Sequence, residues 1–187
     1  MKLRRLSIEA VLVILLAWTS QAGAQESGKK VEVRGLSFGA DEATIRRAEK
    51  SKFVRERRIG AVKILHYSDS LLGEPVAVGY RLLNGALYEI RYIFERPGGC
   101  SHSLSLYEKL HAELAVKYGE PKAKSFDDER KCIRITEWNY SGDGRPTTIY
   151  VGLDGTKHRS SLAVFYFDQE QAARVDAAQD AVDEGKL

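Results

Sequence analysis

Apolar and polar residues alternate in two runs on either side of an Asn-Gly turn signal at 84–85, and this pattern predicts a β-hairpin over residues 76–94. A two-residue loop would mix apolar and charged residues on both faces, so we predict a three-residue loop over 84–86. That register also places Arg81 opposite Glu89, a favourable cross-strand pair. It gathers on one face the side chains Val76, Val78, Tyr80, Leu82, Tyr88, Ile90, Tyr92 and Phe94.

Apolar residues at three- and four-residue spacing over 104–118 predict an amphipathic helix. Its apolar stripe consists of Leu104, Tyr107, Leu110, Leu114 and Tyr118. Ser105 and Glu108 form a capping-box pattern at its start, and Gly119 marks its end. A short helix is also predicted after Asp41, whose carboxylate can cap a first turn.

The remaining apolar runs predict further strands. One covers residues 59–67, before the hairpin, and three follow the long helix at 132–140, 147–153 and 161–167. Residues 162–167 are apolar on both faces, so we expect either a central strand or a strand that is covered on both sides.

These elements predict an α+β fold. Helix, three strands, helix and three strands follow one another, and an acidic C-terminal helix or tail occupies residues 168–187. We therefore expect two tandem αβββ units, at 31–96 and 97–167, that form antiparallel sheet with the helices packed on one face.

Four short strings carry a resemblance: Phe38-Gly39 before a helix, Leu87-Tyr88 in a strand, Tyr118-Gly119-x-Pro121 at a helix end, and a later Trp138. With them, residues 31–167 resemble a widespread group of small exported proteobacterial proteins of uncharacterised function. The αβββ unit is also similar to SmpA-type lipoproteins of outer-membrane assembly and, in tandem, to β-lactamase-inhibitor proteins. The resemblance implies protein binding rather than catalysis and assigns no binding residue. Unlike the SmpA-type proteins, this chain has no lipid-bearing cysteine.

The first 24 residues have the three-part organisation of a secretory signal. A basic stretch at 1–5 precedes an apolar run at 6–18, which is shorter than the roughly 20 residues of a membrane-spanning helix. The segment ends in Ala22-Gly23-Ala24, so we predict cleavage after Ala24, with an uncleaved anchor as the alternative. The mature chain is then periplasmic or secreted, with a flexible leader at 25–30 and no stable membrane insertion.

Charge argues against a nucleic-acid partner. The 187 residues contain 29 Lys and Arg and 26 Asp and Glu. Three of these bases and one of these acids lie in the first 24 residues, so the rest of the chain is almost neutral. The charge is unevenly placed, because residues 25–65 are basic and residues 168–187 are acidic. This asymmetry allows the two ends to attract each other or the basic end to attract an acidic partner, unless both are simply solvated.

Cys100 and Cys132 are the only cysteines, and outside the cytoplasm such a pair predicts one disulfide. Two alternatives stay open. Cys100 and His102 share one side of an extended segment and could bind a metal with Cys132 and a fourth ligand, or form a nucleophile pair. The candidates for that fourth ligand are His66, His111 and His158.

The sequence contains no nucleophile-elbow, zinc-protease, P-loop or dinucleotide-binding motif. We therefore expect a non-catalytic module without a cofactor, rather than an enzyme, whose sheet face or edge binds an envelope protein or peptide. The alternative is a periplasmic redox or metal-binding protein that uses Cys100, His102 and Cys132.

Overall fold

A computed structural model describes residues 31–94, 99–121, 127–128, 132–140, 145–155 and 160–183. The predicted signal at 1–24 and leader at 25–30 lie outside this part of the chain. In order, the described residues form α1 (Glu42–Ala48), β1 (Lys52–Ile59), β2 (Val62–Leu71), β3 (Glu74–Leu83), β4 (Ala86–Phe94), α2 (Cys100–Tyr118), β5 (Asp127–Asp128), β6 (Ile133–Tyr140), β7 (Thr147–Gly155), β8 (Ser160–Asp168) and α3 (Gln169–Asp183).

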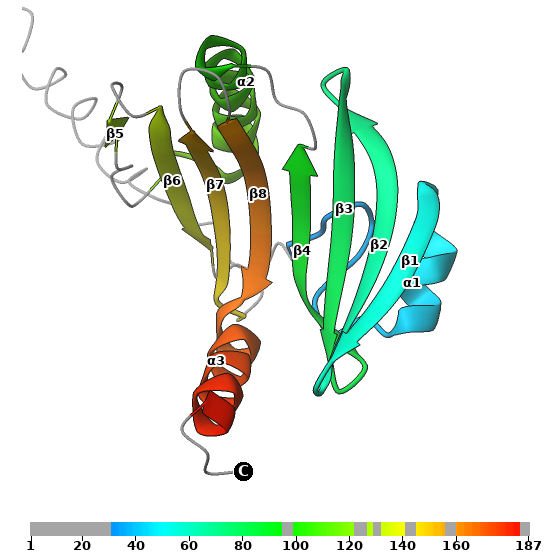
Figure 1. The fold of residues 1–187 in the computed structure, drawn as a ribbon. Helices are drawn as coiled ribbons and strands as arrows, with labels where there is room; N and C mark the ends of the chain where they lie inside the picture. The colour runs from blue at the N-terminus through cyan, green and yellow to red at the C-terminus, as the bar shows by residue number, and fades with distance from the viewer. Residues whose placement is uncertain are drawn as a thin grey trace, which may run out of the picture.

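The strands form one antiparallel sheet in the order β1-β2-β3-β4-β8-β7-β6-β5 (Figure 1). Two meanders, β1 to β4 and β5 to β8, meet where β4 pairs with β8. The predicted α+β class and the C-terminal helix are confirmed. Each half of the described sheet has four strands rather than the expected three, because β1 and β5 were not predicted.

The sequence gives little indication of β1. All eight of its residues are exposed, and the string KFVRERRI has no apolar alternation. The single strand expected over 59–67 is in fact the end of β1, a turn at Gly60 and Ala61, and most of β2. The other additional strand, β5, is two residues long and lies in the charged connection after α2.

α1 and α2 lie on one face of the sheet, behind it in Figure 1, and α3 continues beyond the end of β8. The core fills the space between these two helices and the sheet, where Ile45 of α1 and Leu110 of α2 are buried with the apolar side chains of β3, β7 and β8. We call the opposite side of the sheet the helix-free face. No described helix covers it.

The helix starts differ in how well the sequence predicts them. Asp41 caps α1 as predicted, since its Oδ1 accepts a hydrogen bond from the backbone N–H of Thr44 at 2.8 Å. The capping-box prediction for α2 is wrong, because the helix begins at Cys100 after Gly99. Tertiary contacts explain the extra turn, in which buried Ser103 bonds to Ser160 at 2.6 Å.

The hairpin combines both registers that the sequence suggested. The turn has two residues, Asn84 and Gly85, both with positive φ, so the predicted three-residue loop is wrong. A bulge at Tyr88 then shifts the register, and Arg81 lies opposite Glu89 as predicted. The predicted apolar face is therefore confirmed for Ile90, Tyr92 and Phe94. At the turn end, Leu87 lies opposite Leu82, and Tyr88 lies under the Arg81 guanidinium instead of in the main core cluster.

β8 is central, as predicted from its apolar character, since it lies between β4 and β7. One side, with Leu162 and Val164, packs in the core, whereas Ala163 and Phe165 lie on the helix-free face.

Candidate functional site

The predicted disulfide is present. Cys100 and Cys132 are bonded, with their Cα atoms 5.9 Å apart, and the bond ties the first residue of α2 to the residue before β6. Cys132 is buried in the core. Because both sulfur atoms are in this bond, neither is a thiolate that could bind a metal or attack a substrate.

The histidines proposed as their partners lie elsewhere. His102 is half-exposed, and its Nε2 is 3.1 Å from Oε1 of Glu74 at the start of β3. The ring of His111 packs beside Trp138, with centroids 5.4 Å apart, and His66 lies on the helix-free face. His158 is outside the described residues. Among those residues, no group of three His, Cys, Asp or Glu side chains is arranged to hold a metal ion.

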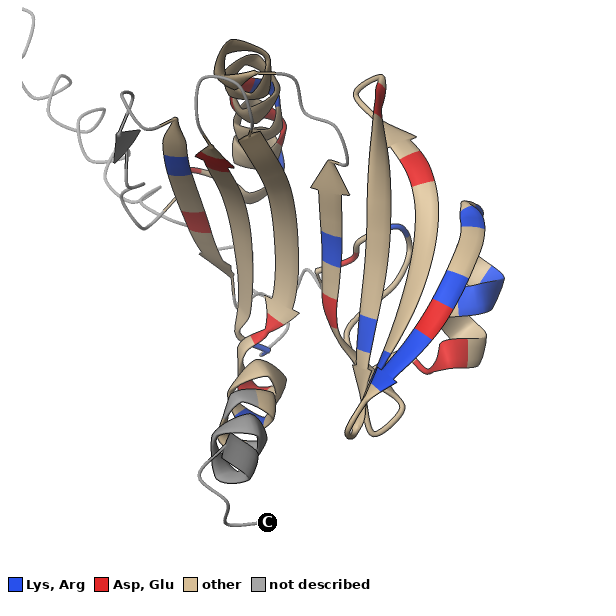
Figure 2. Cartoon of the chain, in the orientation of Figure 1, with Lys and Arg blue, Asp and Glu red and all other residues tan. Residues whose placement is uncertain are grey.

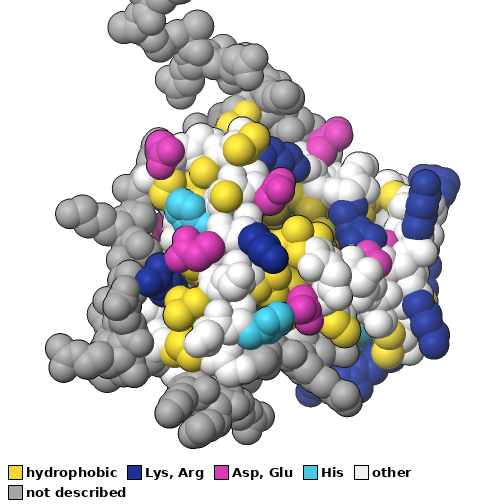
Figure 3. Space-filling model, turned by 90° about the horizontal axis from the view of Figure 1, so that it is seen from above, with side chains coloured by type: hydrophobic (Ala, Val, Ile, Leu, Met, Phe, Trp, Pro, Cys, Tyr) yellow, Lys and Arg dark blue, Asp and Glu magenta, His cyan; other side chains and the backbone are white. Residues whose placement is uncertain are grey.

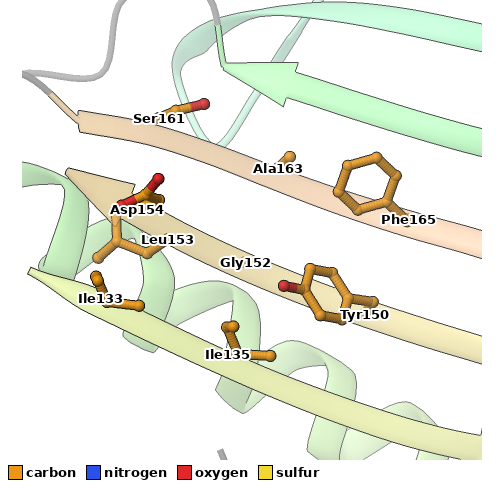
Figure 4. Close-up of a pocket in the computed structure, with 9 residues that line it drawn as sticks. All are labelled: Ile133, Ile135, Tyr150, Gly152, Leu153, Asp154, Ser161, Ala163 and Phe165. Carbon is orange, nitrogen blue, oxygen red and sulfur yellow. The ribbon is translucent and has the colours of Figure 1, made fainter. Parts of the chain in front are cut away.

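The helix-free face contains a hollow of about 400 Å³ over β6, β7 and β8 (Figure 4). We call it the apolar hollow. Its floor follows from the strand register, in which Ile135 lies opposite Gly152 and Gly152 lies opposite Ala163. The small side chain of Ala163 leaves space above the sheet, and Gly152 leaves room for the ring of Tyr150. The lining residues are Ile133, Ile135, Tyr150, Gly152, Leu153, Asp154, Ser161, Ala163 and Phe165.

Aromatic side chains form one wall of the apolar hollow. Tyr150 lies opposite Phe165 on the neighbouring strand, and their ring centroids are 5.7 Å apart. The Tyr150 ring leans over Gly152, where an added Cβ would lie 2.6 Å from Cε1 of the ring. Glycine weakens a strand interior and often marks a close approach to another group. Here it allows the tyrosine ring to lie down against the sheet.

An arginine borders this wall on the first half of the sheet. Cζ of Arg91 lies 5.4 Å from the Phe165 ring centroid, within cation–π range. The Arg91 Nε donates to Oε1 of buried Glu89 at 2.6 Å, and Arg81 Nη1 is 2.8 Å from the second oxygen of that carboxylate. This cluster of two arginines and one glutamate holds the Arg91 side chain beside the hollow.

Further basic residues lie across β2 and β1. His66 pairs with Arg55 in the sheet register, and Arg57 lies on the same face. Burial lowers the pKa of His66, and the positive charges of Arg55, Arg91 and Arg57 lower it further. The neutral form of this histidine is therefore favoured beside the charged arginines. Figure 2 shows the contrast, since β1 is mainly basic whereas β8 has no charged residue before Asp168 at its end.

A second polar cluster lies on the helix side of the sheet, and its side chains bond to one another. Glu49 Oε1 accepts hydrogen bonds from Arg34 at 2.9 Å and from the backbone N–H of Ser51 at 2.8 Å, while the Tyr80 hydroxyl donates to Oε2. Arg34 also pairs with Asp69 at 2.7 Å. The cluster ties the turn at Arg34 and Gly35 to the end of α1 and to β2, which is a structural role.

Because of this cluster, we expect the folded protein to lose stability in acid. Burial raises the pKa of Glu49, but the hydrogen bonds from Tyr80 and Ser51 and the charge of Arg34 outweigh it and lower the pKa. A lowered folded-state pKa contributes stability that is complete above the ordinary glutamate pKa and is lost as pH falls through the folded-state value. Across this pH range, the free energy of unfolding in urea is expected to depend less on pH for Glu49→Gln than for the parent protein. The exposed control Glu113→Gln should follow the parent curve, and a parallel curve for Glu49→Gln would contradict this assignment.

Sequence reasoning did not single out the residues of the apolar hollow. Two signals were available, the run at 162–167 that is apolar on both faces and Gly152 in the middle of a strand. The first was interpreted as a feature of the fold, and the second was not considered.

Within the described chain, none of the helices combines the length and apolar character needed to cross a membrane.

Comparison with known proteins finds no family model, no curated protein and no solved structure that matches this chain.

Proposed function

We propose that this protein is a non-catalytic binding module whose helix-free face holds an apolar side chain of a partner protein or peptide. The observation that carries the proposal is the apolar hollow, an open concavity on one face of a sheet whose other face is already packed in the core. Concave apolar sites with a few polar groups at their margin are typical of binding sites. Burying an apolar side chain there removes apolar surface from water on both partners.

The charges beside the apolar hollow define the chemistry of the partner. Arg91 borders the aromatic wall, whereas Asp154 lines the hollow near the other end. Complementary charges across an interface increase association rates and specificity more than affinity. The partner is therefore expected to present an aromatic or branched aliphatic side chain with an acidic residue next to it on the side of Arg91.

The setting of this interaction is also part of the proposal. The disulfide is consistent with an oxidising compartment, and the predicted signal peptide supports the periplasm or secretion, so we expect an envelope protein or an envelope peptide as the partner. Each half of the chain places a helix before a four-stranded meander. This order supports two tandem units related to the αβββ proteins that bind other proteins, although neither unit matches the expected strand count.

Peptide selection tests the proposal. A random linear peptide library is selected on the disulfide-bonded protein, and the affinity of the best peptide is measured by isothermal titration calorimetry. We expect the selected peptides to contain an aromatic or branched residue next to Asp or Glu. Ala163→Glu, which places a charge in the hollow, should weaken binding about thirtyfold, as loss of a contact worth about 2 kcal/mol does.

Two further variants make the result decisive. Ile135→Ala removes part of the floor without adding charge and should weaken binding about tenfold, which covers the case in which Ala163→Glu folds poorly. Val116→Glu is the matched control, because Val116 is 88% exposed on α2, on the other side of the sheet. Unchanged affinity in both hollow variants, or selected peptides without an apolar residue, would contradict the proposal.

A further inference from the structure

The outer edge of β1 is open. β1 pairs with β2 on one side, and no described strand pairs with its other side (Figure 1). All eight residues of β1 are exposed. The edge of a sheet presents unpaired backbone N–H and C=O groups, and an extended chain can bind them as an additional strand.

The side chains of β1 make this edge strongly basic. The bases Lys52, Arg55, Arg57 and Arg58 form no ion pair with any residue in the described part of the chain. The single acid, Glu56, is 2.8 Å from Arg46 and 3.5 Å from Lys63, so its charge is already neutralised. Figure 3, viewed from above, shows Lys and Arg side chains gathered at the side of the molecule where β1 lies.

Apolar side chains lie between these bases. Phe53, Val54 and Ile59 are 41%, 55% and 44% exposed, and they make up most of the large exposed apolar residues in the described chain. The register with β2 shifts between Phe53 and Arg55, which leaves Val54 without a partner residue. An added strand would therefore meet both unneutralised bases and half-exposed apolar side chains.

We propose that the β1 edge binds an extended acidic segment of another protein as a ninth strand of the sheet. Backbone hydrogen bonds would supply affinity, and acidic side chains of the segment would pair with the bases of β1. This surface is separate from the apolar hollow, which lies over β6 to β8, and does not depend on it.

Charge and conformation argue against two other occupants of this edge, a second copy of β1 and the C-terminal part of the same chain. A second copy of β1 would bring four bases against four bases, and like charges that face each other across paired strands are destabilising. The acidic C-terminal part of this chain is helical over Gln169–Asp183, so it does not offer an extended strand.

Three synthetic probes test the proposal by fluorescence anisotropy. The first is a fluorescein-labelled nine-residue peptide in which Glu alternates with Val or Thr, and the second has Lys in place of Glu. The third is the acidic peptide with alternate backbone amides N-methylated, which removes strand hydrogen bonds but keeps the charge. We expect the acidic peptide to bind, and the lysine and N-methylated peptides to bind at least about tenfold more weakly.

Variants locate the binding. Arg57→Glu should weaken binding of the acidic peptide about five- to tenfold, whereas Lys109→Glu on the exposed side of α2 should leave it unchanged. Ala163→Glu should also leave it unchanged, which separates this surface from the hollow. The proposal is overturned if the N-methylated peptide binds as tightly as its parent, if the acidic peptide fails to bind, or if Arg57→Glu and Lys109→Glu behave alike. It is also overturned if the free protein dimerises through β1.

Discussion

Trp138→Ala is expected to lower the free energy of unfolding by about 3–5 kcal/mol, the range for removing a large buried aromatic side chain. Trp138 is 2% exposed and belongs to the core between α2 and the sheet. Its Nε1–H donates to the backbone carbonyl of Gly119 at 2.8 Å, so the same side chain fixes the end of α2. The substitution therefore removes packing and leaves a helix-terminal carbonyl without this partner.

Trp138→Phe separates the two contributions. It keeps most of the apolar volume but has no donor for Gly119, so we expect a loss of about 1–2 kcal/mol. Urea unfolding followed by circular dichroism measures all three proteins on the same scale, because the variants lack the tryptophan signal. A loss below about 1 kcal/mol for Trp138→Ala would contradict the position of this residue in the core.

The disulfide is expected to have an effect of similar size. Replacing both Cys100 and Cys132 with alanine should lower the free energy of unfolding by about 3.7 kcal/mol, the loop-closure value for a sequence separation of 32 residues. The bond constrains the unfolded chain, and in the folded state it ties the start of α2 to β6. Because alanine is apolar, the buried position of Cys132 is not left with an unpaired polar group.

The change can be followed by the fluorescence of Trp138, the only tryptophan after residue 24. The double variant should lower the urea midpoint, and the parent measured in excess reductant should shift by a similar amount. Equal midpoints for the oxidised parent and the double variant would contradict a structural role. A bond reduced at mild potentials would favour the redox alternative, because structural disulfides resist the glutathione pool.

Local patterns predicted much of the fold because they depend on neighbouring residues. The cap at Asp41, the stop of α2 at Gly119 and the pairing of Arg81 with Glu89 follow from turn chemistry and alternation. The bulge at Tyr88 was missed because either hairpin register accounts for only part of the pattern. β1 was missed because an edge strand with every residue exposed carries no apolar periodicity.

The disulfide and the apolar hollow also differ in how far the sequence could predict them. The disulfide was predictable because the chain has only two cysteines, which leaves one pairing within a molecule. The apolar hollow was not, because its floor comes from three strands whose register brings Ile135, Gly152 and Ala163 into one row. Nothing in the order of these residues along the sequence indicates that they become neighbours in the sheet.

The most direct test of the central claim is to map where a selected peptide binds, using amide chemical shifts of the disulfide-bonded protein. The account predicts that the largest shifts cluster at Ile135, Gly152 and Ala163, on the floor of the apolar hollow. Shifts confined to α2, on the other side of the sheet, with these three amides unchanged, would contradict it.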